Sequence, residues 1–357
     1  MSLKEEFNDN ILLTTMPHQT VWGTTVSPEL RFNALTENTE IRGSARMNFV
    51  KYYGDTGLDT TEQYFQASTA YSMERDVWGL GGAVTRDSTL TGELRETGLV
   101  NARVPRDLRS VNPTWKRSMT ERLSLQSGYQ FADVTYGTTG SLFAYQTHGG
   151  TAGLSYQLSE QDLVEGTGSY LHFEAPSAHS RSSDYGVQLG LTHRFSETLR
   201  GSLTGGARRT TSVVTAMGAT LDDRRTVWAA DGSVEKQFET GVVRGRFSRE
   251  INPSGAGYLV QVDHLSIAVE RELTDTMKGF ITGEAYWIEA LRREVTIPNG
   301  SYYRIAPTWR WQWNEWWSLE VSYSYAGRQA GGGAGAAEQN VTSVNLTYSG
   351  YKWAVSR

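Results

Sequence analysis

The sequence predicts an all-β protein: one transmembrane antiparallel β-barrel that occupies residues 1–357 as a single domain. Three observations lead to this fold class. Apolar and polar residues alternate over stretches of ten or more residues, short polar turns alternate with long connections, and helical periodicity is scarce. The turns predict 18 strands, alternatively 16, with short periplasmic turns and long extracellular loops.

The composition favours β structure and excludes several classes of protein. The chain has 37 glycines and 18 tyrosines but only 8 prolines. No apolar run approaches the roughly 18 residues of a spanning helix, which excludes a helical membrane protein, and the first residues, MSLKEEFNDN, lack the apolar core of a signal peptide. Without cysteine there is no disulfide, thiolate metal site or covalent haem. A net charge of −5 is too small and mixed to predict binding to nucleic acid.

The short turns give the order of the strands. They lie near Glu37, Arg75, Met119, Glu160, Glu197, Glu239, Asp275 and Glu315. A first strand near residues 6–14 and a last strand near 339–353 complete a set of 18; if residues 85–115 form only a loop, the count is 16. A β-propeller would also repeat about every 40 residues. Its blades hold four short strands, whereas these repeats hold two long ones, so a propeller is rejected.

The alternation predicts which residues face lipid. From Tyr185 to Phe195, for example, every second residue is apolar or aromatic. The residues expected to face lipid are Trp22, Phe32, Phe65, Tyr71, Trp228, Phe238, Trp287 and the alternate residues from Trp309 to Tyr325. Aromatic residues near strand ends are typical of the interfacial girdles of membrane barrels. The alternative is a soluble β-sandwich with these residues in its core, but so many long strands rarely form one.

The opposite series of residues predicts a lumen of mixed charge. The candidate pore-lining residues are Arg42, Arg46, Arg122, Arg194, Arg200, Arg208, Arg244, Arg246, Arg304, Arg310, Glu29, Asp184, Asp231, Glu235, Glu250, Glu284 and Glu320. A barrel of 16 to 18 strands is wide enough for an aqueous channel, and rings of charge set the selectivity of such pores. Two hypotheses stay open: passage of polar or anionic solutes or polymers, and cross-linking of neighbouring strands by ion pairs.

Catalysis is not expected from this sequence. The six histidines are dispersed, and His193 falls in the lipid-facing series. Nucleophile elbows, metal-spaced His/Glu pairs and P-loops do not occur. The Gly-rich stretch at residues 79–84 precedes no helix, so it is not a phosphate loop. We therefore predict no enzymatic activity, no metal and no cofactor.

The N-terminal strand pair resembles the start of a known family. Phe7, Asn8, Asp9, Asn10 and Ile11, followed by Thr25, Val26, Ser27 and Pro28, are similar to the opening of outer-membrane β-barrel porins associated with exopolysaccharide and exosortase systems in Gram-negative bacteria. The match covers less than a tenth of the chain. The resemblance implies residence in the bacterial outer membrane and a role in polysaccharide export, with no catalytic residues to transfer.

We therefore expect an outer-membrane pore that passes polar solutes or a glycan. The expected partners are outer-membrane lipid, lipopolysaccharide and periplasmic export components. The alternatives are a sheath around a multihaem cytochrome and a non-conducting receptor or adhesion barrel. We expect the longest connection, residues 85–109, to fold inward as a constriction, because it carries Arg86, Arg95, Arg103, Arg106 and Arg109; a surface loop is the alternative.

Overall fold

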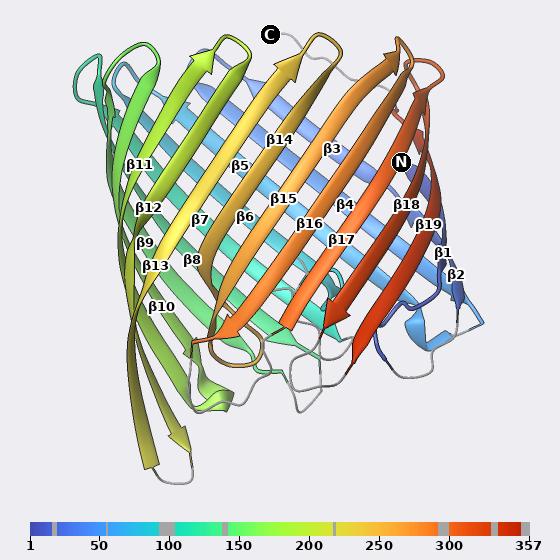
Figure 1. Ribbon diagram of the computed structural model, residues 1–357, viewed down its shortest axis with the longest axis horizontal. Helices are drawn as coiled ribbons and strands as arrows, with labels where there is room; N and C mark the ends of the chain where they lie inside the picture. The colour runs from blue at the N-terminus through green and yellow to red at the C-terminus, as the bar shows by residue number, and fades with distance from the viewer. Residues whose placement is uncertain are drawn as a thin grey trace.

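The computed structural model describes residues 1–15, 20–54, 56–92, 104–137, 142–216, 219–291, 300–329 and 335–350. This part of the chain forms one antiparallel sheet that is rolled into a barrel (Figure 1). The strands are β1 (Ser2–Asn8), β2 (Val21–Ser27), β3 (Glu29–Leu35), β4 (Thr39–Tyr53), β5 (Thr60–Ser72), β6 (Asp76–Ser88), β7 (Pro105–Ser118), β8 (Leu123–Tyr136), β9 (Tyr145–Gln157), β10 (Asp162–Ala175), β11 (Ser180–Ser196), β12 (Leu199–Ala216), β13 (Ala219–Phe238), β14 (Gly241–Pro253), β15 (Leu259–Thr274), β16 (Met277–Ala290), β17 (Gly300–Gln312), β18 (Trp317–Gln329) and β19 (Ala336–Tyr348). Two single turns of 3₁₀ helix, η1 (Thr56–Leu58) and η2 (Pro176–Ala178), lie in the connections.

The barrel closes where β1 pairs with β19, so that its first and last strands are neighbours. β2 and β3 both pair with β4 in one continuous register and are two parts of one strand. The interruption falls at Pro28, whose ring nitrogen has no hydrogen to donate to a ladder. Counted in this way the barrel has 18 strands, and the prediction of 18 is confirmed. The alternative of 16 is wrong, because β6 and β7 extend into the segment 85–115 from both sides.

The connections alternate in length between the two ends of the barrel. Short turns join the strands at one end, shown at the top of Figure 1, and the longer connections lie at the other, where the links from β10 to β11 and from β12 to β13 are as short as the turns. The hairpin of β12 and β13, with 18 and 20 residues, projects beyond its neighbours at the long-loop end (Figure 1). Outer-membrane barrels have short periplasmic turns and longer extracellular loops, and on this rule the short-turn end is periplasmic and the long-loop end extracellular. The terminal strands start and end earlier than predicted, because the chain leaves the ladder after Asn8 and Tyr348.

The outer face of the barrel exposes large apolar side chains, and such exposure would be unfavourable in water. Val187, Leu189 and Leu203 are 67 %, 68 % and 66 % exposed, which is expected of residues that face lipid. The predicted lipid-facing residues Trp22, Phe32, Phe65, Tyr71, Trp228, Phe238 and Trp287 are likewise exposed. Within the described ranges no helix is long and apolar enough to span a membrane, a finding that does not bear on β-barrels.

Candidate functional site

The inner wall of the barrel carries most of the predicted pore-lining charges. Strand register places them on the face opposite the exposed apolar residues: Arg42 and Arg46 on β4, Glu29 on β3, Asp184 and Arg194 on β11, Arg200 and Arg208 on β12, Asp231 and Glu235 on β13, Arg244, Arg246 and Glu250 on β14, Glu284 on β16, Arg304 and Arg310 on β17, and Glu320 on β18. Arg122 differs: β8 begins one residue later, so Arg122 lies in the exposed turn at the periplasmic rim.

Many of these charges form ion pairs that link adjacent strands. Glu235 on β13 accepts from Arg244 on β14 at 2.9 Å and also contacts Arg200 on β12 at 3.1 Å. One carboxylate therefore connects three strands. Arg246 on β14 contacts Asp231 on β13 at 2.7 Å.

The same arrangement recurs elsewhere on the inner wall. Asp184, which is fully buried, accepts from the guanidinium of Arg208 and from the hydroxyl of Thr210, both at 2.6 Å. Arg310 donates to Glu320 across the β17–β18 pair at 2.7 Å. These contacts support the cross-linking hypothesis directly. They do not exclude a selective pore, because paired charges on a wet wall still present dipoles to a passing solute.

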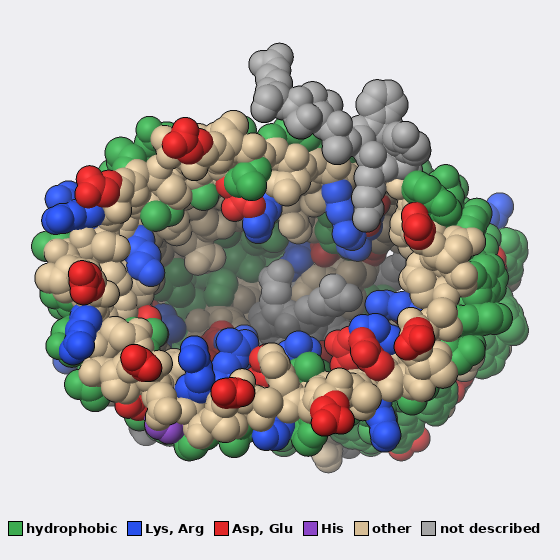
Figure 2. Space-filling model, turned by 90° about the horizontal axis from the view of Figure 1, so that it is seen from above, with side chains coloured by type: hydrophobic (Ala, Val, Ile, Leu, Met, Phe, Trp, Pro, Cys, Tyr) green, Lys and Arg blue, Asp and Glu red, His purple; other side chains and the backbone are tan. Residues whose placement is uncertain are grey.

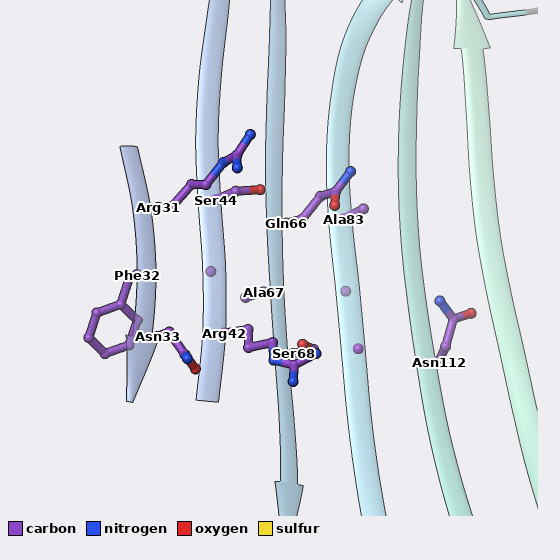
Figure 3. Close-up of a pocket in the computed structure, with 13 residues that line it drawn as sticks. Arg31, Phe32, Asn33, Arg42, Ser44, Gln66, Ala67, Ser68, Ala83 and Asn112 are labelled. Carbon is purple, nitrogen blue, oxygen red and sulfur yellow. The ribbon is translucent and has the colours of Figure 1, made fainter. Parts of the chain in front are cut away.

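A polar hollow opens on the inner wall between β3 and β7. Its cavity of about 710 Å³ is lined from these strands by polar side chains that include Arg31, Asn33, Arg42, Gln66 and Asn112 (Figure 3). Both arginines are held by carboxylates two residues away on their own strands: Arg31 donates to Glu29 and Arg42 to Glu40, each at 2.7 Å. This hollow offers hydrogen-bonding groups to solutes at the periplasmic side of the lumen.

The β14–β15 hairpin bends into the barrel at the extracellular end. β14 pairs with β13 only as far as Arg249, whereas its pairing with β15 continues to Pro253. Beyond Arg249 the hairpin is therefore free of the wall on the β13 side. Its residues are buried on both faces, with Leu259 and Val260 each 1 % exposed, unlike those of a wall strand, which have one exposed face.

The loop of this hairpin is fastened to the opposite part of the barrel. The backbone carbonyl of Gly255 accepts a hydrogen bond from the N–H of Phe143, in the β8–β9 connection, at 2.8 Å. Gly257 has a φ of +86°, and a Cβ there would lie 2.7 Å from the Cβ of Ala178 in η2. Only glycine fits both the backbone conformation and the close approach.

Two apolar clusters fill the space around the hairpin. One joins Leu259 and Ile251 to Phe173, Val134 and Tyr145 of the facing strands. The other packs Val260, Val262 and Tyr258 against inner-wall residues of β16 to β19: Tyr286, Ile288, Tyr302, Ala326 and Ala337. Burial raises the pKa of Tyr258 to about 12. The lumen therefore carries charged side chains on the periplasmic side and is narrowed by apolar contacts on the extracellular side. Figure 2 shows the hollow from the short-turn end, with charged side chains around it and hydrophobic side chains deeper inside.

Part of the segment 85–109, which the sequence predicts to be a constriction, belongs instead to strands of the barrel wall. Its ends belong to β6 and β7, and Arg95 and Arg103 lie outside the described residues. Arg106 forms a buried ion pair with Asp87 at 3.0 Å, while Arg86 pairs with Asp107 on the outer face. The described start of the loop does turn inward, since Thr91 donates to Glu62 at 2.9 Å.

Sequence reasoning missed the β14–β15 hairpin as a constriction. A signal was present in INPSGAGYLVQV, residues 251–262, where Tyr258, Leu259 and Val260 are consecutive apolar residues. Three in a row break the period-two alternation of a wall strand and indicate burial on both faces. In the described residues no group of three or more His, Asp or Glu side chains could hold a metal ion.

A closed antiparallel barrel with an apolar outer belt and a charged inner wall defines a transmembrane β-barrel, located in the bacterial outer membrane. No protein-family model and no curated protein sequence matches the chain.

Solved outer-membrane barrels share this fold. The chain is similar to OccK2 (OpdF) of Pseudomonas aeruginosa, solved in complex with glucuronate, with 10 % identity over 98 % of this chain and 97 % of that one and a TM-score of 0.50. It is also similar to the FrpB iron transporter of Neisseria meningitidis, with 12 % identity and a TM-score of 0.53, covering 92 % of this chain but 61 % of that one. OpdK of Pseudomonas aeruginosa, solved with vanillate, gives 9 % identity, coverage of 97 % and 96 %, and a TM-score of 0.46. At these identities the likeness concerns the fold.

Proposed function

We propose that this protein is a passive channel that lets polar solutes cross the outer membrane. The observation that carries the proposal is a charged, hollow lumen that the inward β14–β15 hairpin narrows within the described part of the chain. A wide vestibule admits hydrated solutes, and a short constriction allows the protein to discriminate among them. The fold shared with OccK2, which was solved with glucuronate, agrees with a small polar cargo.

The finer proposal is that the cargo is a glycan on its way out of the cell. The resemblance at residues 7–11 and 25–28 to porins of exopolysaccharide systems supports it. A glycan chain would have to displace the apolar contacts of the hairpin, so this form of the proposal requires the hairpin to move. It also implies periplasmic partners that supply the energy, in addition to the lipid and lipopolysaccharide around the outer face.

Single-channel recording in planar bilayers tests the channel proposal. We expect discrete conductance steps from the purified barrel and a reversal potential that shifts when a salt gradient is applied. Absence of conductance from barrels that are folded, as judged by heat-dependent mobility on gels, would refute the proposal and favour a non-conducting receptor barrel. Recovery of a tightly bound multihaem protein from the native membrane would instead favour the sheath. Passage of labelled oligosaccharides into liposomes that hold the barrel tests the glycan form separately.

A further inference from the structure

The end of β13 that projects at the long-loop end of the barrel (Figure 1) has an open edge. Residues 219–229 pair with β12 on one side, but the pairing of β13 with β14 begins only at Ala230. Among the described strands no other one pairs with β13 there. In an antiparallel sheet half of the backbone groups of such a stretch point toward the missing neighbour, so the edge can accept a further strand.

The charges on this edge restrict what can pair with it. Asp222 contacts Arg224 at 3.1 Å, and Asp223 contacts Arg225 at 3.4 Å, each pair lying along the strand itself. Charged side chains on an edge strand discourage pairing with foreign chains. The adjoining residues 226–229, with the sequence TVWA, carry no charge and include three residues that favour strands. These four residues are therefore the part of the edge that favours pairing.

The ends of β14, β15 and β16 form a flap, residues 250–262 and 289–290, that strand pairing joins to the wall only at its base. On one side β14 leaves β13 after Arg249, and on the other side β16 continues to Ala290 while its pairing with β17 stops at Ile288. Arg249 lies at the base of the flap. Its guanidinium pairs with Asp263 on β15 and lies 3.8 Å from the ring of Trp228 on β13. The base is therefore fixed, whereas the strands beyond it are free to change partners.

Strand register and residue pattern both fit a longer pairing between β13 and β14. The observed pairing has no register shift up to Arg249. Continuing the same register adds four opposed pairs: Ala229 with Glu250, Trp228 with Ile251, Val227 with Asn252, and Thr226 with Pro253. Ile251 would then face lipid beside Trp228, while Glu250 and Asn252 would face the lumen. That alternation is the one expected of a wall strand.

The apolar residues that the flap would withdraw from the lumen also suit the outer face. Ile251 and Leu259 are 4 % and 1 % exposed and belong to the cluster around Phe173. By register both lie in the same series as Arg249 and Asp263, which faces outward on the wall parts of β14 and β15. In the longer pairing they would turn toward lipid, so contacts in the lumen would be exchanged for contacts with lipid.

We propose that the flap is a gate, which opens when β14 extends its pairing with β13 through residues 250–253 and the flap moves from the lumen into the wall. Its role in passage rests on the proposed channel function, whereas the change of strand pairing does not. In the inward state the cluster around Phe173 and the hydrogen bond from Phe143 hold the flap across the lumen. In the outward state the added pairs hold it, and the ladder ends at Pro253, which has no N–H to donate.

Disulfide cross-linking in proteoliposomes tests the change of pairing. Val227→Cys/Asn252→Cys puts two thiols at opposed inward positions of the longer ladder, where Cα atoms about 5 Å apart suit a disulfide. Arg225→Cys/Asn252→Cys is the matched control, on the same face but two residues out of register. With a mild oxidant we expect at least fivefold more disulfide in the first pair. Equal yields, or no disulfide in either pair, would overturn the proposal.

A second pair makes the result independent of one variant's folding. Trp228→Cys/Ile251→Cys lies at opposed positions on the outer face of the same ladder and should cross-link as the first pair does. Folding of every variant is checked by heat-dependent mobility on gels. Failure of this pair to cross-link in folded barrels would contradict the continued register.

Single-channel recording of the cross-linked barrels tests the gate. Oxidised Val227→Cys/Asn252→Cys should show conductance steps several-fold larger than the same protein after reduction, and the two single variants should not respond to reductant. Conducting barrels with equal steps before and after reduction would overturn the gate. Absence of conductance from the unaltered barrel would refute the proposed channel, while register-specific cross-linking would still support the change of strand pairing.

Discussion

Asn10 shows what a single side chain contributes at the seam of the barrel. It is 1 % exposed, and its Nδ2 donates to the carbonyl oxygens of Thr14 at 2.9 Å and Glu338 at 2.8 Å, while its Oδ1 accepts from the N–H of Thr14 at 3.1 Å. Next to it, both carboxylate oxygens of Asp9 accept from Asn340 at 2.7 Å. The residues behind the family resemblance thus tie β1 to β19 at the extracellular end.

Replacing this asparagine tests the seam. We expect Asn10→Ala to lower the free energy of unfolding by roughly 2–3 kcal/mol, because three hydrogen bonds from a buried side chain to backbone groups would be lost. Urea titration of the barrel in lipid vesicles would measure the change. Asn33→Ala removes an exposed asparagine from β3 and should leave the free energy of unfolding almost unchanged. An equal decrease in both variants would show that the hydrogen bonds of Asn10 do not stabilise the contact between β1 and β19.

Two Arg–Asp pairs on β6 and β7 form a matched experiment on burial. Arg106 and Asp87 have side chains 2 % and 3 % exposed, whereas Arg86 and Asp107 are 57 % and 37 % exposed. We expect Arg106→Met to cost about 3–5 kcal/mol, because it removes the oppositely charged partner of a buried carboxylate. Arg86→Met should cost about 1 kcal/mol or less. Adding Asp87→Leu to Arg106→Met should restore most of the lost stability, and a double variant as unstable as the single one would contradict this explanation.

The tryptophan-rich hairpin of β17 and β18 shows how an element is fixed by its alternation. Trp309, Trp311 and Trp313 contact one another in sequence, with ring centroids 6.1 Å and 5.5 Å apart. The side chain of Asn314 accepts from the N–H groups of Trp316 and Trp317 at 2.8 and 3.0 Å. The side chain of Asn314 therefore stabilises the turn, and the tryptophan rings lie beside the turn, at the periplasmic interface.

Depth in the membrane should decide the cost of a charge on the outer face. Leu191 lies on β11 further from the short turns than Trp311, so we expect Leu191→Arg to cost about 2–4 kcal/mol and Trp311→Arg about 1 kcal/mol or less. Unfolding in vesicles measures both. A larger loss at Trp311 would mean that its ring packing outweighs the membrane depth.

The inner face of the β17–β18 hairpin carries an ion pair that we expect to affect ion selectivity. Arg310 pairs with Glu320 at 2.7 Å, and its guanidinium lies 4.9 Å from the ring of Phe280. We expect Arg310→Ser to leave the barrel folded and to shift the reversal potential toward cation selectivity, because Glu320 loses its partner. Glu320→Gln should shift it in the opposite direction. If Arg310→Ser prevented folding, the assignment of inner and outer faces at this hairpin would be reversed.

The period-two alternation of the sequence predicts the strands of the barrel wall, but it does not predict which segments fold into the lumen. Period-two alternation assigned the faces of strands such as β11 and β17, since a membrane barrel separates lipid from lumen at every residue. Arg122 was misplaced because parity has no meaning inside a turn. The hairpin contact between Gly255 and Phe143 joins residues that are far apart in the sequence, and no short-range period reports such a contact. Length and charge predict a constriction at residues 85–109, but neither property determines where a loop folds.

At the scale of the whole molecule, the question is whether the hairpin is a fixed part of the constriction or a moving one. The chain has no cysteine, so a single disulfide can be introduced without competing thiols. Phe143 and Gly255 are joined by a backbone hydrogen bond of 2.8 Å, so their backbones are adjacent, as a disulfide requires. Gly255 is not among the positive-φ glycines, so a cysteine there is not strained by its backbone.

We therefore predict the behaviour of the double variant Phe143→Cys/Gly255→Cys. If the hairpin must move for solutes to pass, the oxidised form should show several-fold fewer or smaller conductance steps than the same protein after reduction. The two single variants should not respond to reductant, which controls for the loss of the Phe143 ring from its cluster. Equal conductance before and after reduction, with the disulfide verified by mass spectrometry, would show that solutes pass a hairpin that stays in place. The glycan form of the proposed function, which needs the hairpin to move, would then be wrong, while a channel for small solutes would stand.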